Sequence, residues 1–532
     1  MKSKQKNIGL KQIKNAYKTL LSYKEGKRFL EERIIENEEW FKLRCGCTVG
    51  GAVKTQNSAW LFNSIINKHA DAMDCFPEPN VLAREESDEQ QAALFSAILP
   101  VILEQRNFEQ TYSDAWWYKL KSGTGIYGVF WNKELENGLG DVDIKQLDIL
   151  NLFWEPGIKN LEQSANLFYA VAVDKEELIA SYPEKAEQIK NGFGELSAYR
   201  LEDGIADDSK ALVVDWYYKK KVGGKTLLHY CKFSGEALLF ASENEEQYAQ
   251  NGFYDHGKYP VVFDTLFVTE NSPAGFGYID VMKGCQISID KLNAAIERNA
   301  LIGETPRFFI SDSAGINEEE YADWSRPFIH TTGRIDDQTF KQVSVANVSS
   351  NALELLEFKV NEMKETSGNR DFSQGSTNYG VTAASDILAL QEAGDKLSRD
   401  MIKSAFRAYA NICYLILELV RQFYTEPRSF RIAGKGGKVK YLTYQNSNVL
   451  GRKNFVNVHP IFDVKIVPQK QNPYQKAQQN ELAKELFSLG MLDPNRKNEA
   501  ILAIKLMDFY GKEELLNKLS FETKQGDAVC QP

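Results

Sequence analysis

Two long amphipathic patterns constrain this chain more than any other feature of its 532 residues. In residues 275–303, apolar side chains recur every three or four positions, which is one face of a helix about 40 Å long at ~1.5 Å per residue: Val281, Cys285, Ile289, Leu292, Ile296 and Ala300. Residues 382–424 keep this spacing and predict a second helix of about 60 Å. Helices of this length protrude from a core of this size, so something must cover them.

Charged side chains lie on the other faces of both predicted helices. They are Lys283, Asp290, Lys291, Glu297 and Arg298 in the first, and Glu392, Asp395, Lys396, Arg399 and Lys403 in the second. An apolar stripe of this kind is usually part of the core of its own chain. Packing against copies of the same helices in a ring would also cover it, because a heterologous contact closes when the rotation is right.

The segments between the two helices alternate in character. Residues 304–349 look like a small β-rich insert around an acidic run, and residues 350–371 predict a third helix from the spacing of Leu353, Leu356, Val360 and Met363. Residues 372–381 form a loop of small, uncharged residues. The pattern is therefore a helix, a β-insert, a returning helix, a loop and a long helix.

The rest of the chain divides around this unit, and the whole predicts the α+β class. Residues 1–120 are mainly helical: we expect Gly26 to break 8–44 into two helices, 57–79 to be a helix, and 87–120 to be one long helical stretch. Residues 121–274 form a mixed α+β domain, whose later strands are predicted at 211–219, 225–233, 236–242 and 260–268. Residues 425–469 return to β structure, 470–520 are helical, and 521–532 are a flexible tail.

Charge and composition exclude several classes of protein. The net charge is 64 − 73 = −9, so the chain is not a simple DNA-binding module, although an acidic conduit that DNA crosses without sticking remains compatible with it. An odd number of scattered cysteines favours reduced thiols and synthesis in a cytoplasm. The close pair Cys45 and Cys47 suggests incidental thiols more than a metal site. We find no secretory signal and no apolar run long enough to span a membrane.

The sequence Gly123-Thr-Gly125-Ile-Tyr-Gly128 spells the GxGxxG of dinucleotide sites, which need a strand before the glycines and a helix after them. Here a helix is predicted before and a strand after, so the glycines more simply make a tight corner. The chain has no Walker A, GxSxG or HExxH motif. We therefore expect no enzyme activity and no cofactor, with a nucleotide-dependent enzyme using these three glycines kept as an alternative.

The order of these segments resembles the portal (head-to-tail connector) protein family of tailed bacteriophages. The resemblance rests on IIENEEWFKLRCG at 34–46, GTGIYGVFWN at 123–132 with Phe153-Trp154-Glu155-Pro156, and the run from His256 to Pro260 followed by Gly275-Phe276-Gly277-Tyr278 and Gln286, Asp290 and Asn293. Each motif is weak, and their order along most of the chain carries the resemblance. A modest insert at 304–349 and a short C-terminal tail depart from it and argue against a long helical barrel.

The resemblance assigns a role to each segment. It makes 1–120 the helical part of a wing, 121–274 the wing sheet, 275–303 a stem helix, 304–349 a clip, 350–371 the returning stem helix, 372–381 a tunnel loop, 382–424 the channel helix and 470–520 a crown. The implied assembly is a ring, of twelve copies in the family, at one vertex of the virion, through which double-stranded DNA is packaged and ejected. The implied partners are the terminase large subunit, the major capsid and scaffold proteins and a head–tail adaptor. Another virion connector or scaffold protein without DNA contact is the second alternative.

The resemblance also suggests site residues. The tunnel loop offers hydroxyls and amides but no strong phosphate binders: Gln374, Ser376, Thr377, Asn378 and Tyr379. Beside it, Lys359, Lys364 and Arg370 either contact phosphates or belong to an ordinary solvated face. In the clip, four aromatic residues suit either contacts with subunits and the adaptor or burial within the clip itself: Phe308, Phe309, Trp324 and Phe328.

Overall fold

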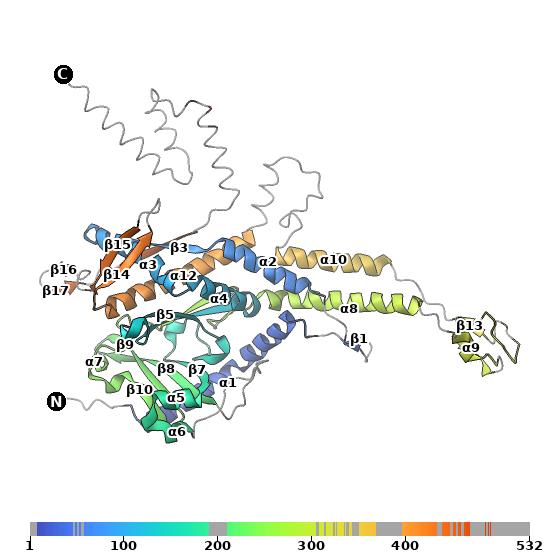
Figure 1. Ribbon diagram of the computed structural model, residues 1–532, viewed down its shortest axis with the longest axis horizontal. Coiled ribbons are helices and arrows are strands. Elements are labelled where there is room, and N and C mark those ends of the chain that lie inside the picture. Colours follow the sequence, from blue (N-terminus) through green and yellow to red (C-terminus); the bar gives the residue numbers. More distant parts are fainter. Residues whose placement is uncertain are drawn as a thin grey trace. The chain divides into compact units, whose positions relative to one another are not determined.

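The computed structural model describes a mixed α+β protein (Figure 1). It covers residues 8–45, 48–49, 53–54, 58–190, 210–304, 308–312, 315–322, 325, 327–334, 336, 340–342, 350–368, 396–433, 439–446, 451–453, 456–458, 462–468, 485, 488 and 490. Contacts divide the chain into two units, Met1–Ala72 with Pro79–Ile466 and Met73–Glu78 with Val467–Pro532. Nearly all the described helices and strands belong to the first unit.

The largest sheet is antiparallel and five-stranded, in the order β10-β9-β8-β7-β6. Its strands are β6 (Leu152–Trp154), β7 (Asn166–Asp174), β8 (Lys210–Val222), β9 (Lys225–Ser234) and β10 (Ala237–Ala241). Alternate residues such as Phe168, Trp216 and Cys231 share a core with helix α1 (Leu10–Phe41), because successive strand side chains point to opposite faces. Short helices α5 (Lys175–Ser181) and α6 (Ala186–Lys190) add Leu178 and Ile189 to a second core. The predicted strands 211–219, 225–233 and 236–242 are confirmed.

A second sheet has the order β11-β4-β5. Its strands are β4 (Thr124–Asn132), β5 (Asp141–Gln146) and β11 (Val261–Thr265), the last of which confirms the predicted strand at 260–268. Helices α4 (Phe108–Ser122) and α12 (Lys396–Phe423) both pack on it. The ring of Phe108 lies 6.1 Å from that of Tyr127 on β4 and 5.4 Å from that of Tyr409 on α12, so one aromatic cluster joins both helices to the sheet.

The GxGxxG segment is a helix-to-strand corner. Gly123 has φ +90°, ends α4 and is followed at once by β4. A Cβ at Gly123 would lie 2.2 Å from the backbone of Phe276, so the position needs glycine both for its conformation and for this close approach. A dinucleotide site places phosphate at the N-terminus of a following helix, and no helix follows here. The nucleotide-enzyme alternative therefore lacks its structural context.

Helix α1 continues through Gly26, so the predicted break at this residue is wrong. A Cβ at Gly26 would lie 2.5 Å from the side chain of Pro156, which follows β6. The glycine therefore allows close packing of α1 beside the five-stranded sheet and does not interrupt the helix. Buried residues of α1, including Leu20 and Ile34, occur on both sides of this position.

The predicted single helical stretch at 87–120 is two helices, α3 (Glu89–Gln105) and α4. Asn107 separates them with the left-handed φ of +50°, whereas Pro100 lies inside α3. The predicted helix at 57–79 ends earlier, as α2 (Trp60–Asp74). Helix α2 is followed by a strand that was not predicted, β3 (Pro77–Ala83), because the two prolines of this segment suggested that no regular element follows the helix. Strand β3 pairs with a single partner, β18 (Phe462–Pro468), and proline is tolerated in a strand that has one free edge.

The predicted helix at 275–303 is α8 (Tyr278–Glu304), and that at 350–371 is α10 (Ser350–Ser367). The two helices contact each other and run side by side (Figure 1). Between them lie β12 (Phe308–Ile310), α9 (Glu318–Ala322) and β13 (Phe340–Gln342), with β12 and β13 antiparallel. Of the predicted helix 382–424, the structure describes α12; residues 372–381 and 382–395 lie outside the described residues.

The remaining elements are short. The described helices and strands not yet mentioned are α7 (Glu246–Ala249), β1 (Thr48–Val49), β2 (Val53–Lys54), β14 (Arg428–Ala433), β15 (Val439–Tyr444), β16 (Gly451–Lys453) and β17 (Val456–Val458). The strands form antiparallel pairs, β1 with β2, β14 with β15 and β16 with β17. Apart from three single residues, the predicted helices at 470–520 and the tail at 521–532 lie outside the described residues. Among the helices that are described, none has the length and apolarity to cross a membrane.

Candidate functional site

Helix α8 carries two buried polar side chains, Gln286 and Asp290, each 1% exposed. Asp290 Oδ1 accepts hydrogen bonds from the backbone N–H of Ser58 at 2.9 Å and from its hydroxyl at 2.6 Å. Gln286 Oε1 accepts one from the backbone N–H of Leu61 at 3.0 Å, and its amide donates to Asp290 at 2.9 Å. Leu61 lies in the first turn of α2 and Ser58 lies two residues before that helix begins, so Gln286 caps α2 and Asp290 binds the segment that leads into it. We call Ser58, Leu61, Gln286 and Asp290 the capping junction.

The prediction that Asp290 lies on a face of α8 away from the apolar stripe is wrong. The buried stripe of the helix includes Met282, Gln286, Ile289 and Asp290, whereas Val281 is 44% exposed. The stripe is thus rotated from the one expected, because the N-terminus of α2 offers unpaired N–H groups and a positive dipole end that favour a carboxylate. A polar pair four residues apart was the only signal of this junction in the sequence.

Helix α1 makes a second polar joint with α8. The Asn37 amide donates to Asp280 Oδ1 at 2.9 Å, and the Arg33 guanidinium lies 3.8 Å from the same carboxylate. Lys283 forms an ion pair with Glu36, also on α1. The beginning of α8 is therefore fixed to two helices of its own chain by directional contacts.

The α8–α10 pair also presents large apolar side chains to solvent. These are Val281 (44% exposed), Leu301 (68%), Leu353 (46%), Leu355 (46%) and Phe358 (62%), which we call the exposed apolar set. On α10, Met363 and Ser367 are the buried residues. Single exposed apolar residues are ordinary, and several on two neighbouring helices are a feature that interfaces often have. Leu353 and Leu355 lie two positions apart, so they point to different sides of α10.

A buried ion pair joins α4 to the sheet beneath α12. Lys119 Nζ lies 2.7 Å from Asp264 Oδ1, with side chains 0% and 2% exposed. The Ser404 hydroxyl of α12 donates to the Thr265 carbonyl at 2.9 Å, next to this pair. Burial lowers the pKa of Lys119 and raises that of Asp264, while their mutual attraction opposes both shifts. The partners are 145 positions apart, so no local pattern in the sequence indicated them.

The far end of α12 is anchored by a second group of charges. The Tyr424 hydroxyl donates to Asp141, which also forms an ion pair with Arg106. The guanidinium of Arg428 lies 3.9 Å from the Tyr424 ring centroid, and one of its nitrogens lies 3.9 Å from Asp141. Helix α12 is thus held at both ends on the β11-β4-β5 sheet.

The predicted phosphate-contact residues are only partly described. Lys359 Nζ forms an ion pair with Glu362 at 2.6 Å, and this contact raises the pKa of Lys359. The backbone carbonyl of Lys359 accepts a hydrogen bond from the Cys285 thiol at 3.1 Å. Lys364 Nζ lies 5.8 Å from the ring centroid of Trp60. Arg370 and the tunnel-loop residues Gln374, Ser376, Thr377, Asn378 and Tyr379 lie outside the described residues. Their proposed contacts with DNA stay predictions.

Two of the four predicted clip aromatics are exposed in this chain. Phe309 is 67% exposed and Phe328 is 76% exposed, so neither is buried within the clip. Phe308 lies on β12, opposite Gln342 of β13, and Trp324 lies outside the described residues. The predicted contact of Phe309 and Phe328 with another subunit or an adaptor stays a prediction.

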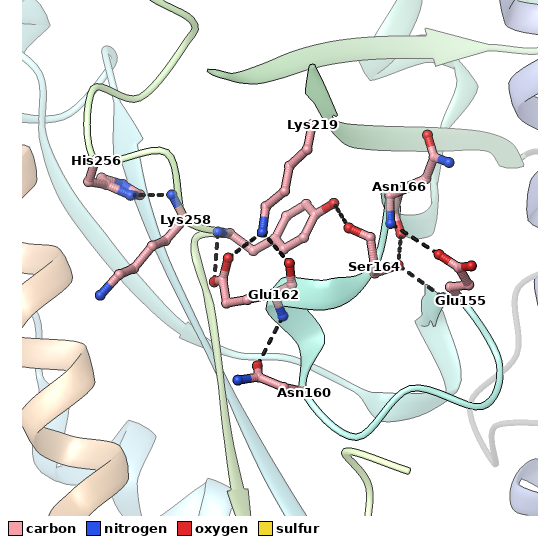
Figure 2. Close-up of polar contacts among 10 residues, drawn as sticks. Glu155, Asn160, Glu162, Ser164, Asn166, Lys219, His256 and Lys258 are labelled. Atoms are coloured by element: carbon pink, nitrogen blue, oxygen red, sulfur yellow. Dashed lines mark hydrogen bonds and ion pairs between the residues drawn. The ribbon is translucent and has the colours of Figure 1, made fainter. Parts of the chain in front are cut away.

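Figure 2 shows a polar cluster between the two sheets. Lys219 forms an ion pair with Glu162, and its Nζ lies 4.4 Å from the ring centroid of Tyr259. Glu162 Oε1 accepts a hydrogen bond from the backbone N–H of Tyr259 at 3.1 Å, and the Tyr259 hydroxyl donates to the carbonyl of Ser164 at 2.8 Å. Burial raises the pKa of Tyr259, so its hydroxyl stays a donor.

A cavity of about 790 Å³ lies beside this cluster. It is lined by the 159–163 loop, by Lys258 and Tyr259, by β11, by Pro273, and by Asn411, Tyr414 and Leu415 of α12. Close by, His256 Nδ1 accepts the backbone N–H of Lys258 at 3.0 Å, and burial lowers the pKa of His256 to about 3. No local pattern of residues indicated this cavity, because its walls come from three distant segments.

Comparison with known proteins adds one match. The family model described as the phage P22-like portal protein matches residues 74–262 and 301–528, which is most of the chain. The matched residues include both sheets up to β11, the clip, α10 and α12, while most of α8 lies between the two matched stretches. No curated protein matches the chain.

Proposed function

Because the chain belongs to the P22-like family of phage portal proteins, we propose that copies of it form a ring at one capsid vertex, through which double-stranded DNA enters and leaves the virion. Members of this family are structural components and not enzymes. The observation that carries the proposal of a ring is the exposed apolar set of the α8–α10 pair. Neighbouring copies would cover these side chains, as a repeated heterologous contact that closes on itself requires.

The capping junction supports the same proposal from the inside of the subunit. It fixes the direction of α8 relative to α2 by hydrogen bonds, which depend on orientation, and not only by apolar packing. A closed ring needs each copy to present its two contact surfaces at one fixed angle. Rigid attachment of α8 meets that need.

Passage of DNA is the further part of the proposal. The chain is acidic overall, at −9, and its tunnel-loop sequence carries hydroxyls and amides, so duplex phosphates would find few strong binding partners. Weak, distributed contact suits a polymer that must slide. We propose that Gln374, Ser376, Thr377, Asn378 and Tyr379 contact the duplex in transit, with Lys364 and Arg370 adding scattered phosphate contacts.

Docking of other proteins is proposed for the clip. Phe309 and Phe328 are exposed aromatic residues, a type enriched in protein–protein interfaces. A motor such as the terminase large subunit and, later, a head–tail adaptor would each use this surface. Capsid and scaffold proteins would contact the outside of the ring.

The DNA role is tested by deleting residues 373–380 from the full chain. We expect the deleted chain to form rings, seen by electron microscopy, and to package or retain less DNA than the intact chain. A control of equal length, with this segment replaced by glycine and serine, separates the effect of the side chains from that of the loop length. Normal packaging by both variants would favour a connector without DNA contact, and loss of rings would make the segment structural.

A further inference from the structure

Strand β11 lies at an open edge of its sheet. The Pro260 carbonyl accepts the N–H of Val129, and the N–H of Leu266 donates to the Gly123 carbonyl. In an antiparallel pair these groups alternate, so the even-numbered residues of β11 bond to β4 and the N–H and C=O groups of Val261 and Phe263 point to the other side. Within the described residues, neither of these two makes a backbone hydrogen bond outside the sheet ladder.

The cavity of about 790 Å³ lies along this open edge. The 159–163 loop forms one wall, and Tyr414 and Leu415 of α12 form another. At Thr265 the edge is closed, because the Ser404 hydroxyl already donates to its carbonyl. The volume falls within the ~300–1,000 Å³ of ordinary ligand sites. The groove thus has room beside Val261 and Phe263 and ends at Thr265.

The rim of the groove is positively charged. Lys258 Nζ lies 4.0 Å from the ring centroid of Tyr414, and Lys159 is exposed on the opposite wall. Neither lysine forms an ion pair with any of the described residues. Glu162, the carboxylate in the lining, is already bound by Lys219 and by the backbone of Tyr259 (Figure 2). Lys258 also interacts electrostatically with Glu418 of α12, which is already ion-paired with Arg421, so the groove keeps the full charge of Lys159 and a partly neutralised charge at Lys258.

We propose that this groove binds an extended, acidic peptide segment of another protein, which adds a strand to β11. Main-chain groups of the peptide would pair with Val261 and Phe263, as in β-strand addition, and its carboxylates would face Lys159 and Lys258. A polypeptide backbone matches an open strand edge, because it presents N–H and C=O groups at the same spacing. A nucleic acid has no such groups in register, and two lysines would neutralise few of its phosphates. This inference goes beyond the proposed DNA conduit and does not depend on ring formation.

The test uses the full chain and a blocked hexapeptide of alternating glutamate and valine. We expect hydrogen exchange at the Val261 and Phe263 amides to slow on binding, while the Val262 and Asp264 amides, already bonded to β4, do not change. This alternation is the signature of an added strand, since only every second residue faces it. Two control peptides should fail to bind: one with alternating lysine and valine, and the acidic one with N-methylated valines.

Variants test the role of charge. Replacing both lysines, Lys159→Ala with Lys258→Ala, should weaken peptide binding about tenfold, as expected for two charge pairs near the surface. Lys18→Ala, on an exposed position of α1, is the matched control and should leave binding unchanged.

Four results of the peptide experiments would overturn the proposal, and one result with the ring alone would do so as well. The first two are no binding of the acidic peptide, and slowed hydrogen exchange that does not alternate between neighbouring amides of β11. The other two are equal binding of the lysine peptide, and displacement of the acidic peptide by a DNA duplex. A fifth is protection of Val261 and Phe263 in assembled rings without peptide, lost in monomers, because the occupant would then be a second copy of this chain.

Discussion

The two α8 residues of the capping junction and the exposed apolar set lie on the same helix pair, where the usual relation between polarity and burial is reversed. Gln286 and Asp290 are 1% exposed, whereas Leu301 and Phe358 are 68% and 62% exposed. Buried polar groups are costly unless each is paired, and their pairing fixes one orientation. Exposed apolar groups gain nothing until another surface covers them. One side of α8 is therefore buried within its own chain, and we propose that a second copy covers the exposed apolar side chains of the pair.

The largest effect should follow from placing a charge in the exposed apolar set. Phe358→Asp should abolish ring assembly, because a carboxylate would have to be buried without a partner at the subunit contact. The stability of the single chain should change by no more than about 0.5 kcal/mol, since the site is exposed there. Sedimentation measures assembly and chemical unfolding measures stability.

Phe29→Asp is the matched control, because Phe29 on α1 is 76% exposed and lies outside the helix pair. It should leave assembly intact. If Phe358→Asp still forms rings, or if it unfolds the monomer, the assignment of this surface to a neighbouring copy is wrong.

The capping junction should respond in the opposite way. Asp290→Ala leaves the N–H and hydroxyl of Ser58 without their acceptor, while the Gln286 amide keeps the Ser58 carbonyl, and this should lower the free energy of unfolding by about 2–4 kcal/mol. The neighbouring exposed residue supplies the control Lys291→Ala, with little expected change. Urea unfolding of both variants as monomers gives the comparison. A loss in Asp290→Ala no greater than in the control would mean that the junction does not hold α8.

These two regions also show how far the sequence could be read. The period of three to four residues predicted α8 and α10 closely, because helix geometry is local. The same period placed Asp290 on the wrong face, because Asp290 binds Ser58, just before α2 and more than 200 positions away. The exposure of Leu353 and Phe358 was likewise hidden, because one sequence does not tell which neighbour covers an apolar residue.

The same limit explains the other outcomes. Strands β8 to β10 and the corner at Gly123 follow from local patterns, and both were predicted correctly. Gly26 was taken as a helix break because its contact with Pro156 is long-range. The cavity beside β11 and the buried pair of Lys119 and Asp264 depend on tertiary packing alone.

Acid should affect the packed part of the subunit and not the exposed apolar set. Burial holds the pKa of His256 at about 3, below its value of 6.5 in the unfolded chain. The unfolded state therefore binds a proton first as the pH falls, and stability decreases between about pH 6.5 and 3. From pH 7 to 5 the loss should be roughly 2 kcal/mol. The free energy of unfolding, measured by urea unfolding at pH 7 and at pH 5, should show this loss.

His256→Gln should remove most of this pH dependence, because glutamine keeps an acceptor for the Lys258 N–H without titrating. His330→Gln is the control, since His330 is 81% exposed. An unchanged pH dependence in His256→Gln would show that other groups cause the acid response.

The smallest effect is expected at Lys359 on α10. Its ammonium group is already paired with Glu362, so Lys359→Ala should leave the salt dependence of DNA release from rings nearly unchanged. Glu362→Ala removes the ion-pair partner of Lys359. It should steepen the salt dependence of DNA release from rings by no more than about one additional phosphate contact would. A strong effect of Lys359→Ala alone would instead make it a phosphate contact and would place DNA beside α10.

We propose that copies of this chain cover the exposed apolar set of one another around a channel. Electron cryomicroscopy of the purified full chain would show this arrangement. We expect a closed ring with a central opening, in which Phe358 of each copy is buried against its neighbour. A stable monomer, an open filament, or a ring in which Phe358 stays exposed to solvent would contradict it.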